Sequence, residues 1–465
     1  MVFNYDASDP LAVVTAPPPN EMPQEKAARE EREAEAQRIS DQIDEELRAH
    51  RAVLKKEEQM VKILLLGQSE SGKSTTLKNF RMRFAWDKWV QERASWRTVI
   101  QLNLVRSVNT ILEALQQELS EEEVTEGQFT NKHHLLSMRL GPLRGVETDL
   151  KRLLGAKPEE VQATPSEALP TGSARTSSEF FVRSRNFRNF LQASRSTDGQ
   201  RQSIRQEGVS SHDITEVIVG CKDDVKSLWR DNAIQEMVER RKIRLEDSAS
   251  FFLNASDRLA SRNYEPTDDD IVRARLRTLD IQEHELNVEE GMVVHLDGKP
   301  RVWKIYDVGG SRTQRQAWLP YFDQVNAVIF LAPISCFDER LQEDPRVNRL
   351  EDSFILWKAI CSSKLLSRTT LVIFLNKVDL LEKKIASGVM VNRYLPSYAD
   401  RRNEKDAVVS YLRSKFKDTV KHHSPEPRVC HIHVTSVINT QMTAKTLLSV
   451  RDGILREHLK KANLV

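Results

Sequence analysis

The chain has few cysteines, no long apolar run and almost no net charge. Its 465 residues include only four cysteines, which lie far apart in the sequence: Cys221, Cys336, Cys361 and Cys430. This spacing fits neither a disulfide framework nor a zinc site, and it is typical of a reducing compartment. The 70 lysines and arginines nearly balance the 68 aspartates and glutamates, so the charge indicates no particular partner.

No segment has the length and apolarity of a transmembrane helix, and the N-terminus lacks the pattern of a secretory signal. The chain starts Met1-Val2, whereas N-myristoylation needs a glycine directly after the initiator methionine. We therefore expect a cytoplasmic protein without an N-myristoylation signal.

A glycine-rich loop follows the first apolar segment. Residues 61–66 predict a buried strand, residues 67–75 read Gly-Gln-Ser-Glu-Ser-Gly-Lys-Ser-Thr, and a helix is predicted after them. This strand–loop–helix pattern indicates a phosphate-binding loop, whose N–H groups point at anionic oxygens. Lys73 would bind the outer phosphates, and Ser74 would ligate Mg²⁺. A chance Gly/Ser turn is the alternative, and the order of the elements argues against it.

A second motif, Asp307-Val308-Gly309-Gly310, follows another predicted strand. Its carboxylate can hold Mg²⁺ through water, and Gly310 lets the backbone approach the terminal phosphate. Alone, the motif is equally typical of a plain turn. Its position after a strand, downstream of a phosphate loop, favours the functional interpretation.

A third motif, Asn376-Lys377-Val378-Asp379, indicates which base is bound. The Asp379 carboxylate can accept hydrogen bonds from the guanine N1–H and exocyclic amine, a donor pair that adenine lacks. The Lys377 stem can cover a face of the base. This motif disfavours an ATPase or a kinase. Thr435-Ser436-Val437 would close over the base through backbone N–H groups, although it is uninformative by itself.

After Pro266, short apolar runs alternate with helical periodicity, which predicts a mostly parallel α/β sheet. The predicted strands are residues 292–296, 302–306, 325–331, 371–375 and 429–434. The first strand, residues 61–66, lies far upstream, and the stretches 80–119 and 214–259 are helical in pattern. A mostly helical module is therefore predicted to be inserted after the first helix of the α/β domain.

Two further segments leave alternatives open. After a lead of about 20 residues that we expect to be disordered, residues 21–58 predict a charged helix with one apolar stripe, Ile39, Ile43 and Leu47. This helix is either solvated or binds a partner along the stripe. In residues 120–211 arginines interleave with phenylalanines. A flexible insertion is favoured there over a nucleic-acid patch, so no nucleic-acid partner is expected.

Over residues 21–119 and 212–465 the chain resembles the alpha subunits of heterotrimeric G proteins. The matching segments are Glu70-Ser71, Asp247-Ser248-Ala249, residues 271–278 (first switch), Gly309-Gly310 with Arg312 and Trp318 (second switch), and the C-terminal residues 454–460 and 463–465. The resemblance implies a Ras-like P-loop GTPase domain of mostly parallel sheet with helices on both faces. This domain would comprise residues 59–80 and 268–465. An all-helical domain, residues 81–267, would be inserted into it and carry the flexible insertion at about 120–211, and residues 1–58 would contain an N-terminal partner-binding helix.

The resemblance also implies a role for each matching residue. Arg275 would stabilise charge on the transferring phosphoryl group, and Ser311 stands at the second catalytic position. Ser74 and Thr278 would ligate Mg²⁺, and Asp307 would hold it through water. The residues implied to bind GTP or GDP are Glu70, Ser71, Gly72, Lys73, Ser74, Thr75, Asp247, Ser248, Val272, Arg273, Thr278, Gly310, Asn376, Lys377, Asp379 and Val437.

Three positions depart from the family pattern. Ser311 stands where the family has the glutamine that orients the attacking water, and Ser69 replaces a glycine of the phosphate loop. Asp280 replaces a glycine after the first switch. Because a shorter side chain at 311 and a Cβ at 69 disturb the hydrolytic geometry, we expect slow GTP hydrolysis. A GTP-binding adaptor with little or no hydrolysis is the alternative.

The function implied by the resemblance is a guanine-nucleotide switch that relays signals from seven-helix receptors. The expected partners are a beta–gamma dimer at the N-terminal helix and second switch, a receptor at the C-terminal tail, and an unknown effector. Peripheral attachment at the inner face of the plasma membrane is expected to come through a prenylated partner.

Overall fold

The computed structural model describes residues 22–58, 60–120, 129–155, 181–182, 190, 211–241, 243, 245, 247–278, 281–287, 302–341 and 343–461. The chain divides into two units, Met1–Met60 and Val61–Val465. Several predicted features lie outside the described residues: the lead, most of the 120–211 insertion, Asp280, the strand at 292–296 and the tail at 463–465.

The described residues of the N-terminal unit form a long helix, α2 (Pro23–Glu58), as their composition predicts. Ion pairs at i,i+4 spacing, such as Arg29–Glu33 at 2.8 Å, support this helix. The predicted stripe is exposed: Ile39, Ile43 and Leu47 have relative accessibilities of 53%, 51% and 47%.

The second unit contains a six-stranded sheet in the order β4-β5-β1-β6-β7-β8, which confirms the predicted α/β class. Its strands are β1 (Val61–Gly67), β4 (Gln282–Asn287), β5 (Val302–Asp307), β6 (Ala327–Pro333), β7 (Thr370–Asn376) and β8 (Cys430–Val434). Every neighbouring pair is parallel except β4 and β5. A separate parallel pair joins β2 (Phe181–Val182) and β3 (Arg277–Thr278).

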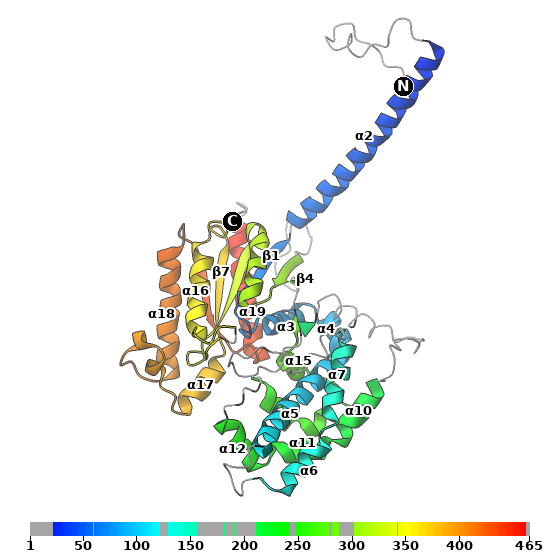
Figure 1. The fold of residues 1–465 in the computed structure, drawn as a ribbon. Coiled ribbons are helices and arrows are strands. Elements are labelled where there is room, and N and C mark those ends of the chain that lie inside the picture. The colour runs from blue at the N-terminus through cyan, green and yellow to red at the C-terminus, as the bar shows by residue number, and fades with distance from the viewer. Residues whose placement is uncertain are drawn as a thin grey trace. The chain divides into compact units, whose positions relative to one another are not determined.

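Two pairs of helices cover the sheet (Figure 1). One face carries α16 (Arg349–Ser362) and α18 (Lys405–His423), and the other carries α3 (Lys73–Phe84) and α19 (Thr440–Lys461). The shorter elements of this part of the chain are α15 (Asp268–Arg273), η3 (Arg312–Gln324), α17 (Val378–Ala386), η4 (Val391–Arg393) and η5 (Pro396–Tyr398).

The side chains of β1 point alternately to the two faces of the sheet, which explains why helices pack on both faces. Successive side chains of a strand point to opposite faces, so a strand buried on both sides is apolar throughout. Leu64 packs in a hydrophobic cluster with Trp357 of α16, whereas its neighbour Leu65 packs with Phe80 of α3.

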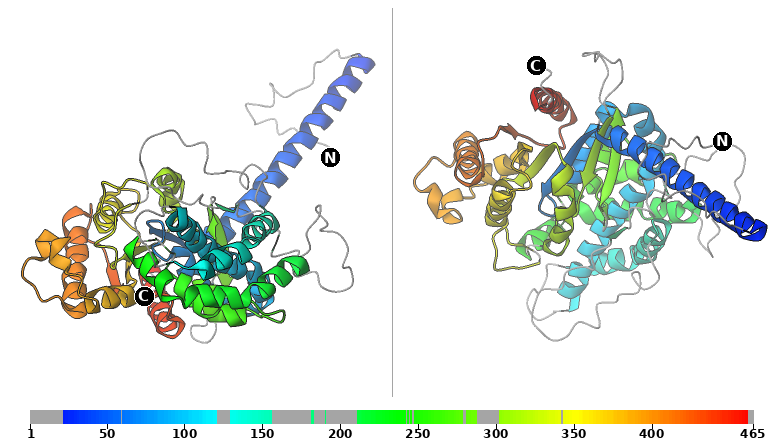
Figure 2. Two further views of the ribbon diagram at one scale, coloured as in Figure 1. Left: turned by 60° about the horizontal axis from the view of Figure 1, so that its bottom comes forward. Right: turned by 90° about the horizontal axis from the view of Figure 1, so that it is seen from above.

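The remaining helices form their own hydrophobic cluster around α5, and Figure 2 shows them side by side in cyan and green. They are α4 (Trp86–Glu92), η1 (Arg93–Ser95), α5 (Trp96–Ser120), α6 (Asn131–Arg139), α7 (Leu143–Leu153), α10 (Ser211–Gly220), α11 (Lys222–Trp229), α12 (Asn232–Arg240), α13 (Ala249–Asn254) and α14 (Ser256–Leu259). The predicted domain boundaries near residues 80 and 267 stay predictions. In the part of the chain that the structure describes, no helix is long and apolar enough to cross a membrane.

Of the strands in the six-stranded sheet, one escaped the sequence analysis, and the short pair β2 and β3 was not predicted either. β4 has the sequence Gln-Glu-His-Glu-Leu-Asn, and only Leu286 in it is buried. It pairs along the edge of the sheet with β5, where Leu286 lies opposite Trp303. A strand at the edge of a sheet can be polar at most positions if one apolar side chain faces the core. The composition of β4 therefore did not identify it as a strand.

Substitution of Trp303 in β5 would test how much the hydrophobic core under α3 stabilises the fold. Its side chain is fully buried, and its ring centroid lies 6.3 Å from that of Phe80. Trp303→Ala is expected to lower the free energy of unfolding by about 3–5 kcal/mol, because it leaves a large cavity. Trp86, which is half exposed, is the matched control, and Trp86→Ala is expected to cost about 1 kcal/mol or less. Equal losses for the two variants in urea unfolding would contradict this packing.

Candidate nucleotide-binding site

The phosphate loop joins β1 to α3 through a backbone that few residues can adopt. Gly67 has φ +143°, and a Cβ there would lie 2.6 Å from the carbonyl oxygen of Leu331 in β6. Glu70 has φ 60°, a left-handed conformation that is uncommon for a residue with a side chain and clusters at functional sites. The loop therefore has a fixed, non-repetitive shape, as a nest of N–H groups for an anion requires.

Lys73 lies buried under this loop. Its Nζ donates to the carbonyl oxygens of Gly67 at 2.9 Å and Gln68 at 2.7 Å. Burial lowers the pKa of Lys73 from 10.5 to about 8, while the Asp307 carboxylate acts in the opposite direction. At neutral pH the site therefore holds a buried cation directly beneath the position predicted for the phosphates.

Ser74 and Asp307 come together at the other side of the loop. The Ser74 hydroxyl donates to Asp307 Oδ2 at 2.7 Å, and burial raises the pKa of this carboxyl group while the Lys73 cation opposes the rise. A hydroxyl and a carboxylate are the hard oxygen ligands that Mg²⁺ prefers. Among the described residues, no three or more His, Cys, Asp or Glu side chains form a group that could hold a metal ion.

Thr278, the other predicted Mg²⁺ ligand, lies in β3 directly after the first-switch arginines. Its side chain is outside the part of the molecule that the structure describes. Its role as a ligand stays a prediction.

Asn376 connects three loops at the base end of the site. Its side chain is fully buried, and its Nδ2 donates to the Ser71 carbonyl oxygen at 2.8 Å. Its Oδ1 accepts from the backbone N–H of Val437 and from the Thr435 hydroxyl, both at 3.2 Å. The first residue of the guanine motif therefore holds the phosphate loop and the loop after β8 in place.

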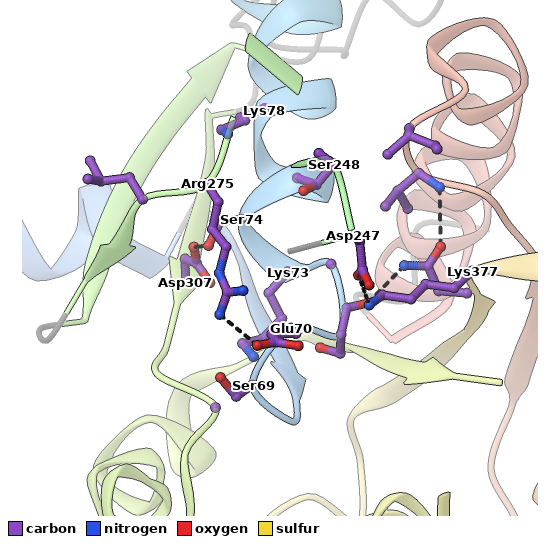
Figure 3. Close-up of a pocket in the computed structure, with 18 of the residues that line it drawn as sticks. Ser69, Glu70, Lys73, Ser74, Lys78, Asp247, Ser248, Arg275, Asp307 and Lys377 are labelled. Carbon is purple, nitrogen blue, oxygen red and sulfur yellow. Dashed lines mark hydrogen bonds and ion pairs between the residues drawn. The ribbon is translucent and has the colours of Figure 1, made fainter. Parts of the chain in front are cut away.

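The other two members of the guanine motif face the pocket. Asp379 accepts a hydrogen bond from Ser436 Oγ at 2.6 Å, which orients its carboxylate. Lys377 has φ 63° at the start of α17, and its Nζ pairs with Asp247, just before α13 (Figure 3). Asp247 and Ser248 thus approach the guanine motif from the helical part of the chain, as the resemblance implies.

Arg275 lies beside the phosphate loop and pairs with it. Its Nη2 donates to Glu70 Oε1 at 2.7 Å (Figure 3). Arg349 of α16 approaches the same glutamate at 3.5 Å and donates to the Ser69 carbonyl oxygen at 3.0 Å. Arg273, two residues before Arg275, instead pairs with Asp269 at 3.0 Å. Of these two first-switch arginines, only Arg275 pairs with the phosphate loop.

A shared carboxylate lies behind the loop. Gln68 is buried, and its Nε2 donates to Asp352 Oδ2 at 2.7 Å and to the Arg349 carbonyl oxygen at 2.5 Å. Asp352 also accepts two hydrogen bonds from Arg315 of η3, at 3.0 and 2.6 Å. The phosphate loop and the second switch therefore use the same side chain of α16.

Ser311 begins the second switch, and its hydroxyl donates to Gln314 Oε1 at 2.8 Å. The Gln314 carboxamide lies against Gly309, where a Cβ would be only 2.1 Å from Oε1. Gly310 lies against the phosphate loop, and its carbonyl oxygen accepts from Ser69 N at 3.1 Å. Ser311 thus reaches the pocket together with a glutamine three residues later.

All the predicted site residues except Thr278 line one pocket. They are Glu70, Ser71, Gly72, Lys73, Ser74, Thr75, Asp247, Ser248, Val272, Arg273, Arg275, Asp307, Gly310, Ser311, Asn376, Lys377, Asp379 and Val437. Sequence reasoning missed Lys78, which also lines the pocket, and three side chains outside the lining that contact site residues: Gln68, Asn103 and Arg349. These contacts depend on how distant helices pack, so no local motif signals them.

The fold and the site define a guanine-nucleotide-binding protein of the P-loop class. The chain belongs to the G-protein alpha subunit family, whose model matches residues 37–454. Guanine nucleotide-binding protein alpha-4 subunit of Mycosarcoma maydis is 31% identical, with 100% of this chain and 97% of that protein aligned. The alpha-16 subunit of Caenorhabditis elegans is 30% identical over 87% of this chain and 90% of its own. The chain is therefore a guanine-nucleotide-binding signalling switch.

Asp379 tests the predicted recognition of guanine. Asp379→Ala is expected to weaken GTP binding roughly 100-fold or more, because two hydrogen bonds to a charged group are lost at about 1.5–3 kcal/mol each. Titration with a fluorescent GTP analogue measures the change, with ATP as competitor. Asp406→Ala, at an exposed position of α18, is the control. Undiminished affinity in the Asp379 variant, or ATP competing as well as GTP on the unaltered protein, would contradict the assignment.

Proposed function

We propose that this protein hydrolyses GTP slowly and, as a switch, relays signals from seven-helix receptors. The observation that supports this best is the convergence of Arg275, the Ser74–Asp307 pair and Asp379 on one pocket. Family members are GTPases in general, and the residues expected for phosphate, Mg²⁺ and guanine are present in this chain. The basic test is GTPγS binding and GTP turnover by the purified protein.

The residues suggest how the site would act on GTP. The N–H groups of the loop and Lys73 would bind the phosphates, and Ser74 with Asp307 would hold Mg²⁺, which neutralises phosphate charge when bound. Arg275 would exchange the Glu70 carboxylate for the transferring phosphoryl group. Since Glu70 also lies near Arg349, this exchange would leave it near a second cation.

The residue at the water-orienting position is the main reason to expect slow GTP hydrolysis. The Ser311 side chain is short, and its hydroxyl is engaged with Gln314. Ser69 adds a side chain to the same pocket, and its backbone N–H donates to the Gly310 carbonyl oxygen at 3.1 Å. Both features favour a reduced rate, and a GTP-binding adaptor without hydrolysis is the second candidate. The intact Arg275 favours the GTPase.

The double variant Ser69→Gly, Ser311→Gln tests the reduced rate. It is expected to raise the single-turnover rate constant of GTP hydrolysis by on the order of 10²–10³, because one positioned group typically contributes this much. GTPγS affinity should stay unchanged. Rates equal to those of the unaltered protein would show that these two serines do not limit hydrolysis.

Gln314 is the one glutamine among the described residues that line the pocket, whereas Gln316 lies exposed on η3. If Gln314 orients water in place of Ser311, Gln314→Ala is expected to lower the residual hydrolysis at least about 10-fold. Gln316→Ala should leave it unchanged. Single-turnover assays on both variants measure this. A Gln314 variant as active as the Gln316 variant would exclude the role.

The proposed partners follow the family pattern. The exposed stripe Ile39, Ile43 and Leu47 on α2 is suited to a beta–gamma dimer, together with the second switch, where Leu319 is exposed. The end of α19 and the tail would contact a receptor, and the effector is unnamed. Peripheral location at the inner face of the plasma membrane, through a prenylated partner, belongs to the same proposal.

A further inference from the structure

One buried amide of the helical part holds the backbone of Arg275 from both sides. Asn103 lies in α5 and is 2% exposed. The backbone N–H of Arg275 donates to Asn103 Oδ1 at 2.6 Å, and Asn103 Nδ2 donates to the carbonyl oxygen of Arg275 at 2.8 Å. A single side chain thus satisfies both backbone polar groups of the proposed catalytic arginine.

The surroundings of Asn103 show why this pairing matters. Its neighbours Leu102, Leu104 and Val105 are buried in the hydrophobic cluster of the helical part. A polar side chain in such a core costs free energy unless it is hydrogen-bonded, and asparagine is also a poor helix former. Both hydrogen bonds that the Asn103 carboxamide makes with described residues are to Arg275, so this residue is better explained by the arginine than by the stability of α5.

A second buried side chain holds the residue before the arginine. Lys78 of α3 donates from Nζ to the carbonyl oxygens of Ala274 at 2.6 Å and Ile271 at 2.9 Å. The backbone that carries Arg275 is therefore fixed by α3 on one side and by α5 on the other. Beyond the backbone, the guanidinium pairs with the phosphate loop through Glu70.

We infer that Asn103 is a positioning residue for GTP hydrolysis, which fixes the backbone of Arg275 so that only its side chain must move onto the phosphoryl group. The inference rests on the proposed GTPase function. A displacement of about 1 Å in a catalytic group can cost roughly 100-fold in rate. Because Asn103 belongs to the helical part, the correct placement of the arginine depends on α5 remaining packed against the first switch.

The test is a double-mutant cycle between Asn103 and Arg275. Asn103→Ala is expected to lower the single-turnover rate constant of GTP hydrolysis about 10- to 100-fold while GTPγS affinity changes less than about 3-fold. In an Arg275→Ala background the same substitution should have no further effect on the rate, because its target is already lost. An undiminished effect in that background, or no effect in the unaltered protein, would overturn the inference.

Asn109 provides a matched control for general destabilisation. It is a buried asparagine of the same helix, and its Nδ2 donates to Glu147 at 2.7 Å within the helical part. Asn109→Ala is expected to lower the melting temperature about as much as Asn103→Ala and to leave the rate constant unchanged. Equal slowing in both variants would show that loosening α5 suffices, and would overturn a specific role for Asn103.

A second readout separates this inference from the GTPase proposal. If the unaltered protein binds GTP without hydrolysing it, the proposed enzyme activity fails, and the positioning of Arg275 is then measured by the affinity for GDP with aluminium fluoride, which imitates the transferring phosphoryl group. Asn103→Ala should weaken that affinity at least about 10-fold without weakening binding of GDP alone. Unchanged affinity for the mimic would overturn the inference.

Discussion

The hydrogen bonds of the buried Asn376 side chain hold the phosphate-binding and base-binding loops together in one pocket. This side chain joins the phosphate loop to the loop after β8. These loops follow strands at different places in the sheet, and their ends meet because parallel strands present their carboxyl ends on one edge. Without a shared partner at that edge, phosphate and base sites would be two separate loops. The guanine motif is therefore a structural element as well as a recognition element.

The sequence predicted those features of the molecule that depend on a few consecutive residues. Apolar runs predicted β1, β6 and β7, because a strand covered by helices on both faces is mostly apolar. Shorter apolar stretches predicted β5 and β8, which also contain charged or histidine side chains. β4 was missed since an edge strand needs only Leu286 in the core. Motif residues were found for a similar reason, because a phosphate nest and a carboxylate for guanine are encoded within a few consecutive residues. Asn103 and Lys78 were not found, since their partners are 172 and 196 residues away.

The replacement at position 311 changes which side chains line the proposed catalytic region, but polar side chains still occupy it. Ser311 shortens the side chain at the water-orienting position, yet its hydroxyl brings Gln314 against Gly309. A Cβ at residue 309 would lie only 2.1 Å from Gln314 Oε1, so the Gln314 carboxamide would have to move. Gln314 thus lies beside Ser311 in this part of the pocket, while Arg275 pairs with the phosphate loop.

The sharing of Asp352 between Gln68 and Arg315 has a consequence for the energetics of switching. Any movement of η3 that withdraws Arg315 leaves a carboxylate that is almost fully buried, with an uncharged amide as the other donor. Such a state is costly, because a buried charge loses its counter-ion. The equilibrium of the second switch is thus weighted toward the docked position before any nucleotide binds. A bound nucleotide then needs to contribute only part of the free energy that holds the switch there.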